Sequence, residues 1–354
     1  MSESAVQTVP VTLVLPCLNE EKGVGDCVSM ALKTFADAGL DGRVIVVDNG
    51  STDRSAHVAM NAGATVIHQA VPGYGAALRT GIEAAPDGVV VMADADGTYE
   101  LSALARLVSP VLEDSADLVL GARLKSATGT TMPFLHRFVG TPVLSWIVNR
   151  AAGGIEVSDS QSGFRAFRRE KMLGLGLTGT GMEFASEMIV CAGWANWRIA
   201  EIDTTYSERV GESKLDTFSD GIRHLRQLLI LSPDVFAVYP GIVMTAMAVV
   251  GWFLSAFVSS HTSQVGSLGW LCLLIAGVFS VIGPVTYAVG MMLRYRAVAL
   301  GVRHKAGGIT LDQLVRRLCW TGIGLLVAVT AMIGLIIVNY HVSDPFLNLS
   351  LIHI

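Results

Sequence analysis

Two aspartates separated by one residue give the strongest chemical signal in the sequence. Asp94 and Asp96 follow directly after the apolar run 89–92, which is typical of a short buried strand. Residues i and i+2 of an extended chain point to the same side. The two carboxylates are therefore expected to converge at the end of that strand. Hard cations such as Mg²⁺ bind carboxylate and phosphate oxygens, so the pair indicates a site for a divalent cation and a diphosphate.

Two further apolar runs also end in polar residues. One carries LPCLNE at residues 15–20, and the other carries VVDNGSTD at residues 46–53. Asp48 could accept a hydrogen bond from a ribose or a base edge, or it could be a turn residue. Ser51 and Asp53 are interpreted as helix caps.

Arginine and lysine residues that could bind phosphate lie further along the chain. Arg123 follows the apolar run 118–120, and Arg137 lies in a stretch expected to be a surface or interfacial loop. The planar guanidinium suits phosphate, so both are candidates for an acceptor phosphate, against the alternative of ordinary surface arginines. Arg209 and Lys214 flank VGES, a turn-forming stretch that could fold over a diphosphate. Asp159, Ser162, Gly163 and Arg165 are expected to shape and brace the site.

The elements that must position these residues alternate along the first half of the chain. Short, wholly apolar runs separated by stretches with helical spacing favour an α/β fold with a mostly parallel sheet, buried on both faces. Ligands in such folds bind beyond the carboxyl ends of the strands, where the polar residues fall. The expected strands are 11–15, 44–47, 89–92 and 118–120, and the expected helices include 25–38 and 54–62.

The second part of the chain is much more apolar than the first. Of the 354 residues, 51% are hydrophobic, and the net charge of −5 gives no indication of a nucleic-acid partner. Three runs are long enough to cross about 30 Å of hydrocarbon as helices. None has an acidic or basic residue in its interior, which argues against a transporter. The three predicted spans are 235–258, 268–293 and 320–340.

Charge around these spans predicts their orientation. The loop after the second span is rich in arginine and lysine, whereas residues 259–267 carry neither. The positive-inside rule then puts the basic loop and the N-terminal domain on the cytosolic side of a cell (inner) membrane. The N-terminus has no signal-peptide pattern, and the five cysteines show no C-x-x-C spacing, which agrees with that side.

The expected domains follow from these patterns. Residues 1–216 form a cytosolic α/β domain, 217–233 an interfacial amphipathic helix, and 234–342 a transmembrane domain. An ordinary packed helix is the alternative for 217–233. Residues 343–354 form a tail, of which 349–354 match the translation of a transposon end used in sequencing libraries, so we assign nothing to them.

Taken together, the motifs resemble those of family 2 glycosyltransferases. They are most similar to the branch of dolichyl-phosphate mannose synthase and bacterial polyprenyl-phosphate glycosyltransferases. The resemblance implies an A-type, Rossmann-like fold, a UDP- or GDP-sugar donor with Mg²⁺ or Mn²⁺, a polyprenyl phosphate acceptor, and inversion at the anomeric carbon. It covers residues 10 to about 230 and rests on LPCLNE, VVDNGSTD, MADADGTYE, GAR, SDSQSGFRAFRR, GMEFASEM and RVGESK, in the family's order.

The resemblance also implies roles for individual residues. It agrees with a metal at Asp94 and Asp96. The predicted catalytic residues are Asp96, Arg123 and Arg137, and the two arginines are included as the candidates for the acceptor phosphate. Leu18 and Asn49 depart from the aromatic residue and the aspartate usual in the family, and Gly97-Thr98 is also unusual. Asp48 is a further candidate because it stands at the end of a strand-like run. The donor-binding positions that the resemblance implies are Pro16, Leu18, Glu20, Val47, Asn49, Asp94, Ala95, Asp96, Arg123, Arg209 and Lys214.

No general base is expected, because a lipid monophosphate with a second pKa near ~6 is largely ionised at neutral pH. The metal would act as a Lewis acid on the leaving diphosphate. A processive polysaccharide synthase is one alternative, although the Q-x-x-R-W motif usual in such enzymes is absent. A non-catalytic membrane scaffold is another, against which the intact acidic pair argues. Homo-oligomerisation is left open.

Overall fold

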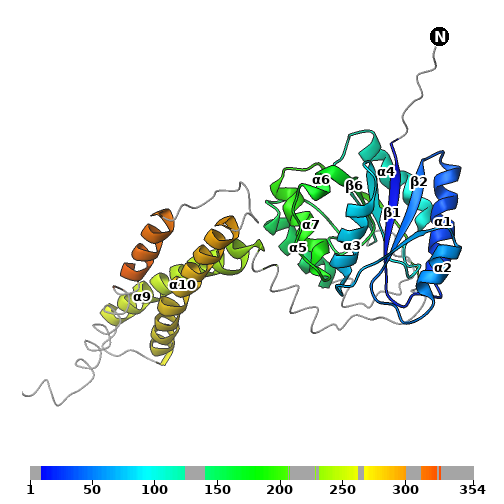
Figure 1. The fold of residues 1–354 in the computed structure, drawn as a ribbon. Coiled ribbons are helices and arrows are strands. Elements are labelled where there is room, and N and C mark those ends of the chain that lie inside the picture. The colour runs from blue at the N-terminus through cyan, green and yellow to red at the C-terminus, as the bar shows by residue number, and fades with distance from the viewer. Residues whose placement is uncertain are drawn as a thin grey trace, which may run out of the picture. The chain divides into compact units, whose positions relative to one another are not determined.

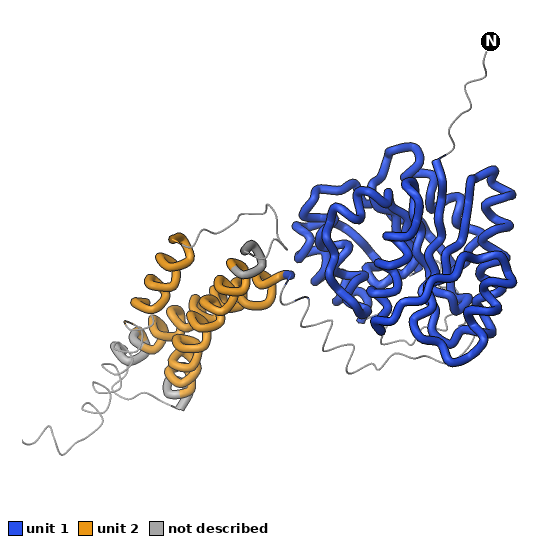
Figure 2. Tube along the Cα trace, in the orientation of Figure 1, with its two compact units in different colours: residues 1–231 blue, residues 232–354 orange. Residues whose placement is uncertain are grey.

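The computed structural model divides the chain into two compact units, residues 1–231 and 232–354 (Figures 1 and 2). It describes residues 9–123, 140–205, 207, 228, 231–261, 267–299, 312–324 and 327. Arg137, Arg209, Lys214 and most of the predicted interfacial helix lie outside the described residues. So does most of the third predicted span.

Among the described residues of the first unit, seven strands form one sheet in the order β3-β2-β1-β4-β6-β5-β7. All neighbouring strands are parallel except where β6 runs antiparallel to β4 and β5. The sheet is therefore mostly parallel, as predicted. The strands are β1 (Val11–Cys17), β2 (Gly42–Asp48), β3 (Thr65–His68), β4 (Val89–Met92), β5 (Leu118–Ala122), β6 (Arg165–Arg168) and β7 (Ile199–Asp203).

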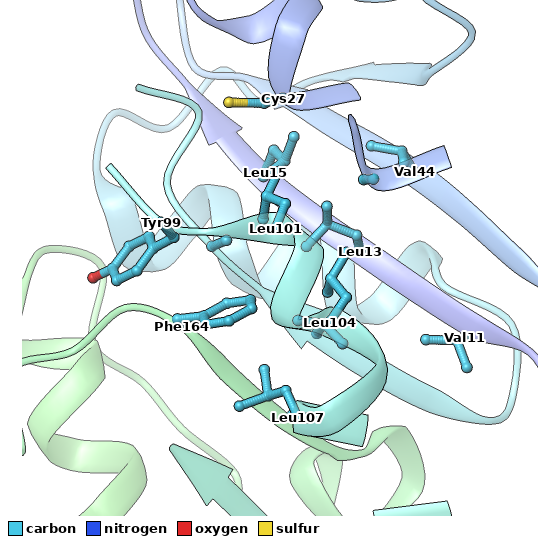
Figure 3. Packing of buried hydrophobic residues seen from close by; sticks show 14 of the residues in the cluster. Val11, Leu13, Leu15, Cys27, Val44, Tyr99, Leu101, Leu104, Leu107 and Phe164 are labelled. Atoms are coloured by element: carbon cyan, nitrogen blue, oxygen red, sulfur yellow. The ribbon is translucent and has the colours of Figure 1, made fainter. Parts of the chain in front are cut away.

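Helices cover the sheet and close its core. Leu13 and Leu15 of β1 pack in a buried cluster with Leu104 and Leu107 of α4 and with residues of α1 (Figure 3). On the other face α3 lies so close to β1 that a Cβ on Gly81 would stand 2.3 Å from Val14. The helices are α1 (Val24–Asp37), α2 (Ser55–Asn61), α3 (Tyr74–Ala84), α4 (Leu104–Leu112), α5 (Thr141–Ala151), α6 (Arg169–Leu173) and α7 (Glu183–Trp194), with the short 3-10 turn η1 (Leu101–Ala103).

The second unit contains a pair of long helices. A π-helical turn, η3 (Asp234–Val238), leads into α9 (Tyr239–His261), which packs on α10 (Ser267–Ala299). Small residues allow the close approach, since a Cβ on Gly251 would stand 2.8 Å from the Ala276 Cβ. The Trp252 indole N–H also donates to the Ser280 hydroxyl at 2.8 Å.

Two helices in the described part of the chain are long and apolar enough to cross a membrane. They are Asp234–Ser255 and Leu271–Tyr295, at the places of the first two predicted spans. Large apolar side chains point outward from them, with Phe253 73% and Leu274 66% exposed. Such an apolar surface is typical of a helix pair that contacts lipid.

Candidate donor site at the carboxyl edge of the sheet

Polar residues gather at one edge of the sheet because of its strand directions. Parallel strands bring the carboxyl ends of β1, β2 and β4 together, and β5 runs parallel to them on the far side of β6. The reversed β6 begins at this edge, where Arg165 pairs with Met92 and Leu120. Residues that follow the other strands and residues that precede β6 therefore form one site, as expected for a parallel sheet.

Asp96 and Asp94 follow β4 and are held by different partners. The Asp96 carboxylate, in a residue only 5% exposed, accepts hydrogen bonds from the Thr98 N–H at 3.1 Å and the Thr98 hydroxyl at 2.7 Å. Gly97 between them has φ +76°, a conformation that glycine adopts most easily. The unusual Gly-Thr pair thus orients Asp96.

The Asp94 carboxylate accepts a hydrogen bond from the Tyr74 hydroxyl at 2.9 Å. Burial, and next the nearby Asp94 charge, raise the pKa of Tyr74 well above its usual value. The phenol therefore remains a donor across the physiological pH range.

The donor set fits a magnesium or manganese ion that is shared with a ligand. Among the described residues no group of three or more His, Cys, Asp and Glu could hold an ion. One or two carboxylates completed by phosphate oxygens are the usual protein environment of Mg²⁺. Asp94 and Asp96 would supply the carboxylates, and a bound diphosphate the remaining oxygens.

Asp48 and the loops around it form the opposite side of the site. Asp48 is buried and accepts a hydrogen bond from the Ser51 N–H at 3.1 Å, while its second oxygen lies 3.0 Å from Nδ1 of His68. The prediction that Ser51 caps a helix is wrong, because its hydroxyl accepts the Asn19 N–H at 2.9 Å. Asp53 does act at a helix start, by accepting the N–H of Ser55 at 2.9 Å.

Asn49 is bound to the segment 69–73 by all of its amide groups. Its Nδ2 donates to the carbonyls of Gln69 at 3.0 Å and Val71 at 2.7 Å, and its Oδ1 accepts the Gly73 N–H at 2.6 Å. A carboxylate could not donate the first two bonds. Asparagine in place of the family's usual aspartate therefore allows all three hydrogen bonds to the segment 69–73, which we call the latch at Asn49.

The other predicted donor residues differ in how far their side chains are exposed to solvent. Leu18 is 39% exposed, whereas Glu20 is buried and its N–H donates to the Ser55 hydroxyl at 2.8 Å. Val47 and Ala95 have buried side chains, so only their backbone could contact a ligand. Pro16 is partly buried within β1.

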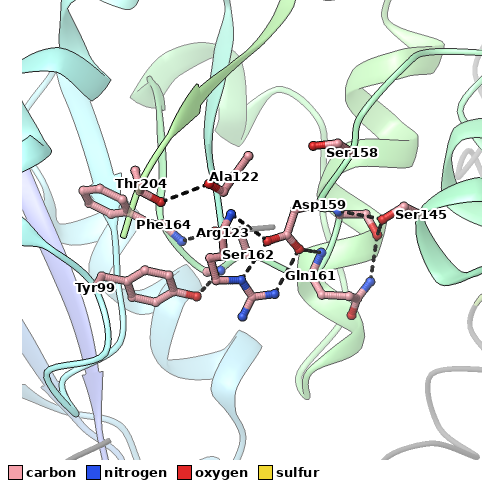
Figure 4. Close-up of polar contacts among 12 residues, drawn as sticks. Tyr99, Ala122, Arg123, Ser145, Ser158, Asp159, Gln161, Ser162, Phe164 and Thr204 are labelled. Carbon is pink, nitrogen blue, oxygen red and sulfur yellow. Dashed lines mark hydrogen bonds and ion pairs between the residues drawn. The ribbon is translucent and has the colours of Figure 1, made fainter. Parts of the chain in front are cut away.

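Arg123 forms an ion pair with Asp159 at the end of β5 (Figure 4). Its Nε and one terminal nitrogen donate to the two carboxylate oxygens at 2.7 and 2.9 Å, and its N–H donates at 3.1 Å. Asp159 is fully buried, and Glu201 of β7 accepts the N–H groups of Ser158 and Asp159 at 2.9 and 3.1 Å. The guanidinium orientation is thus set by two successive carboxylates.

Arg165 braces the segment that precedes β6. Its guanidinium is fully buried and donates to the carbonyls of Ser162 at 2.8 Å, Ser160 at 2.9 Å and Ala185 at 2.5 Å. Burial lowers its pKa to about 10, so it keeps its charge at neutral pH. The contacts of Asp159, Ser162, Gly163 and Arg165 agree with the expectation that they brace the site.

Sequence reasoning missed Tyr74, Tyr99 and Glu201. Tyr99 accepts the Gly163 N–H at 2.6 Å and stacks on Phe164, with ring centroids 5.5 Å apart. Its place three residues after Asp96 was the available signal. Tyr74 lies 20 residues before its partner, so nothing local indicated its contact.

Comparison with known proteins identifies the family of the chain. The glycosyl transferase family 2 model matches residues 12–174. The chain is 37% identical over 246 residues to the low-salt glycan biosynthesis hexosyltransferase Agl6 of Haloferax volcanii, across 69% of this chain and 59% of that protein. It is 33% identical to the dolichyl-phosphate hexose transferase of the same organism, across 60% of this chain and 89% of that protein.

The fold of the first unit is also found in a solved enzyme. Glucosyl-3-phosphoglycerate synthase from Mycobacterium tuberculosis, in complex with Mn²⁺, UDP and glucosyl-3-phosphoglycerate, superposes with a TM-score of 0.51 at 23% identity, across 63% of this chain and 80% of that one. The first unit therefore has an A-type glycosyltransferase fold. The chain belongs to glycosyl transferase family 2.

Proposed function

We propose that this glycosyltransferase transfers a single sugar from a nucleoside-diphosphate sugar to a polyprenyl phosphate, with inversion. The observation that carries the proposal is the Asp94–Asp96 pair at the carboxyl edge of the sheet, in a chain that also contains two helices suited to a membrane. The name of the relative that acts on dolichyl phosphate supports this acceptor class. The Mn²⁺ and UDP bound to the solved neighbour support the donor class.

The proposed reaction gives each part of the site a distinct task. Asp94 and Asp96 would hold Mg²⁺ or Mn²⁺, which when bound stabilises the charge of the leaving diphosphate. Asp48 and the backbone at Val47 are proposed to contact the nucleoside. Arg123, oriented by Asp159, would offset the charge of the acceptor phosphate, and Arg137 is proposed to do the same.

The acceptor phosphate needs orientation more than activation, because it is already an anion at neutral pH. Holding it in line with the anomeric carbon is the main task of the arginines. We place the reaction at the cytosolic face of the membrane, with Asp234–Ser255 and Leu271–Tyr295 as spans. A membrane anchor would concentrate the enzyme where its lipid substrate is confined. Arg209 and Lys214 are proposed to close over the diphosphate.

The test uses the full-length protein in lipid nanodiscs with a panel of labelled UDP- and GDP-sugars and either dolichyl or undecaprenyl phosphate. Label should enter the organic phase as a lipid carrying one sugar. A polymeric product would instead favour the polysaccharide synthase reading, and no transfer from any donor would favour a scaffold.

Asp96→Asn should reduce this transfer by at least about a hundredfold, because metal-based charge stabilisation contributes several kcal/mol. The variant should fold, since an asparagine oxygen can still accept both Thr98 hydrogen bonds. Asp87→Asn is the matched control, because the Asp87 side chain is 91% exposed in a pair with Arg169. Near-normal activity of Asp96→Asn in Mg²⁺ or Mn²⁺ would refute the metal assignment.

A further inference from the structure

Tyr74 connects helix α3 to the acidic pair. It is the first residue of α3, and its hydroxyl donates to the Asp94 carboxylate at 2.9 Å. A hydrogen-bonded partner of a ligand carboxylate fixes the direction in which that carboxylate points, and the loss of such a partner weakens metal binding.

The backbone at Tyr74 is anchored on both sides. The N–H of Gly73 donates to Asn49 at 2.6 Å, and the N–H of Ala76 donates to the Thr180 carbonyl at 3.0 Å. Gly73 has φ +136°, and a Cβ there would stand 2.2 Å from the Thr180 oxygen. The first turn of α3 therefore has little freedom to shift.

The loop that contacts the first turn of α3, residues 178–181, is itself held by a carboxylate. Glu187 of α7 is buried, and it accepts the N–H groups of Gly179 at 2.7 Å and Thr178 at 3.1 Å. The position of the Tyr74 ring thus depends on α7 as well as on the latch at Asn49.

The hydroxyl end of Tyr74 fits a space that only a glycine leaves. A Cβ on Gly163 would stand 2.9 Å from the Tyr74 hydroxyl, 3.2 Å from the Tyr99 hydroxyl and 3.3 Å from the Asp94 carboxylate. The hydrogen bond between Tyr74 and Asp94 therefore lies where three elements meet. These are α3, the turn after β4 and the segment before β6.

We propose that Tyr74 is a positioning residue for the divalent cation: its hydroxyl sets the orientation of Asp94 and thereby the affinity of the site for the metal. The proposal rests on the proposed function, because it needs a cation shared between Asp94 and the donor diphosphate. In this role the phenol acts through its hydrogen bond to Asp94 and not by direct contact with a substrate.

The test compares Tyr74→Phe with Tyr99→Phe in the full-length protein. Each change removes one buried hydroxyl from the same cluster, but the Tyr99 hydroxyl accepts the Gly163 N–H, whereas the Tyr74 hydroxyl donates to Asp94. Binding of Mn²⁺ is followed by electron paramagnetic resonance of the free ion, with UDP and separately with GDP present. Thermal unfolding without metal reports whether each variant is folded.

Tyr74→Phe should weaken nucleotide-dependent Mn²⁺ binding by about ten- to a hundredfold, and excess Mn²⁺ should restore much of the lost transfer. Tyr99→Phe should bind Mn²⁺ within about twofold of the wild type. Equal affinity of Tyr74→Phe and wild type, or an equal loss in both variants, would overturn the positioning role. If wild type binds no Mn²⁺ with either nucleotide, the metal-dependent donor site fails and the inference fails with it.

Discussion

Polar side chains in this site are held in place by several hydrogen bonds each. Asn49 shows this most clearly, since its amide donates to two carbonyls and accepts one N–H from the segment 69–73. The family resemblance gave Asn49 to donor binding. Its contacts show that it also holds the segment 69–73 in shape, and donor binding at Asn49 stays a prediction.

Asn49→Asp tests this reading at the residue scale. An aspartate would place a charged oxygen near the carbonyls of Gln69 and Val71 and lose two hydrogen bonds, each worth about 0.5–1.5 kcal/mol. We expect a lower melting temperature without ligand and a higher KM for the donor, with kcat little changed. Differential scanning fluorimetry and initial rates measure these effects.

The control for this change is Asn61→Asp at the exposed end of α2, where the side chain contacts His57. It should leave both quantities nearly unchanged. Asn49→Asp that is as stable as the control and binds the donor more tightly would show that position 49 contacts the base directly.

At the scale of elements, the reversed strand β6 decides how the site is assembled. Because β6 begins at the edge where the parallel strands end, Asp159 lies beside Arg123 although 36 residues separate them. Strand direction was not predictable here, since β6 is four residues long and two of them are arginines.

The predicted strands were those with wholly apolar sequences, and all four are confirmed within two residues at each end. β3 and β7 were missed because they are only partly buried, so they lack the continuous apolar runs that mark a central strand. The acidic pair was noticed because it closely follows a buried apolar strand. The extended backbone assumed for it is wrong, since Ala95 and Asp96 lie in a turn, and the convergence of the two carboxylates on a cation stays a prediction. The contacts of Tyr74 and Glu201 depend on tertiary packing and have no local pattern.

An ion-pair cluster on Asp117 links three elements of the sheet and gives a pH-dependent prediction. Asp117, just before β5, bonds Lys171 of α6 and the backbone and guanidinium of Arg198, just before β7. Hydrogen bonds from Arg198 are the main reason that its pKa lies well below the usual range. A depressed pKa contributes stability above the unfolded-state value of about 3.9, and this is lost as the pH falls toward the folded value.

Asp117→Asn should therefore lower the melting temperature at pH 7, and its difference from the wild type should shrink below about pH 4. Thermal unfolding across pH 3–7 measures both. Asp41→Asn removes a half-exposed partner of Arg43 and should have little effect, since exposed pairs contribute about 0–1 kcal/mol. A difference for Asp117→Asn that stays constant down to pH 3 would contradict the linkage.

At the scale of the whole molecule, the chain combines a donor-binding unit with a pair of apolar helices. In the helix pair, Asp234 and Arg294 form an ion pair at 3.3 Å, at the end of the pair that the positive-inside rule assigns to the cytosol. The polar ends and the outward apolar side chains between them are what a membrane hairpin requires.

Cysteine labelling in cells tests this orientation. In a background without Cys272 and Cys319, a membrane-impermeant maleimide should label Ser263→Cys in intact cells. Lys305→Cys should react only after permeabilisation. The opposite pattern would reverse the topology and put the donor site on the side where nucleotide sugars are scarce.

Two neighbouring residues connect the two sides of the site. Gly73 donates its N–H to Asn49, and the hydroxyl of Tyr74 donates to Asp94. If the nucleoside binds at Asp48 and the cation at Asp94, as proposed, we expect the two ligands to be thermodynamically coupled through residues 69–74, because the first to bind would reduce the entropy that the second loses. Reciprocity requires each to raise the affinity of the other by the same factor. Uridine and guanosine have no phosphate to coordinate a cation, so the effect of either on Mn²⁺ affinity isolates the coupling carried by the protein alone.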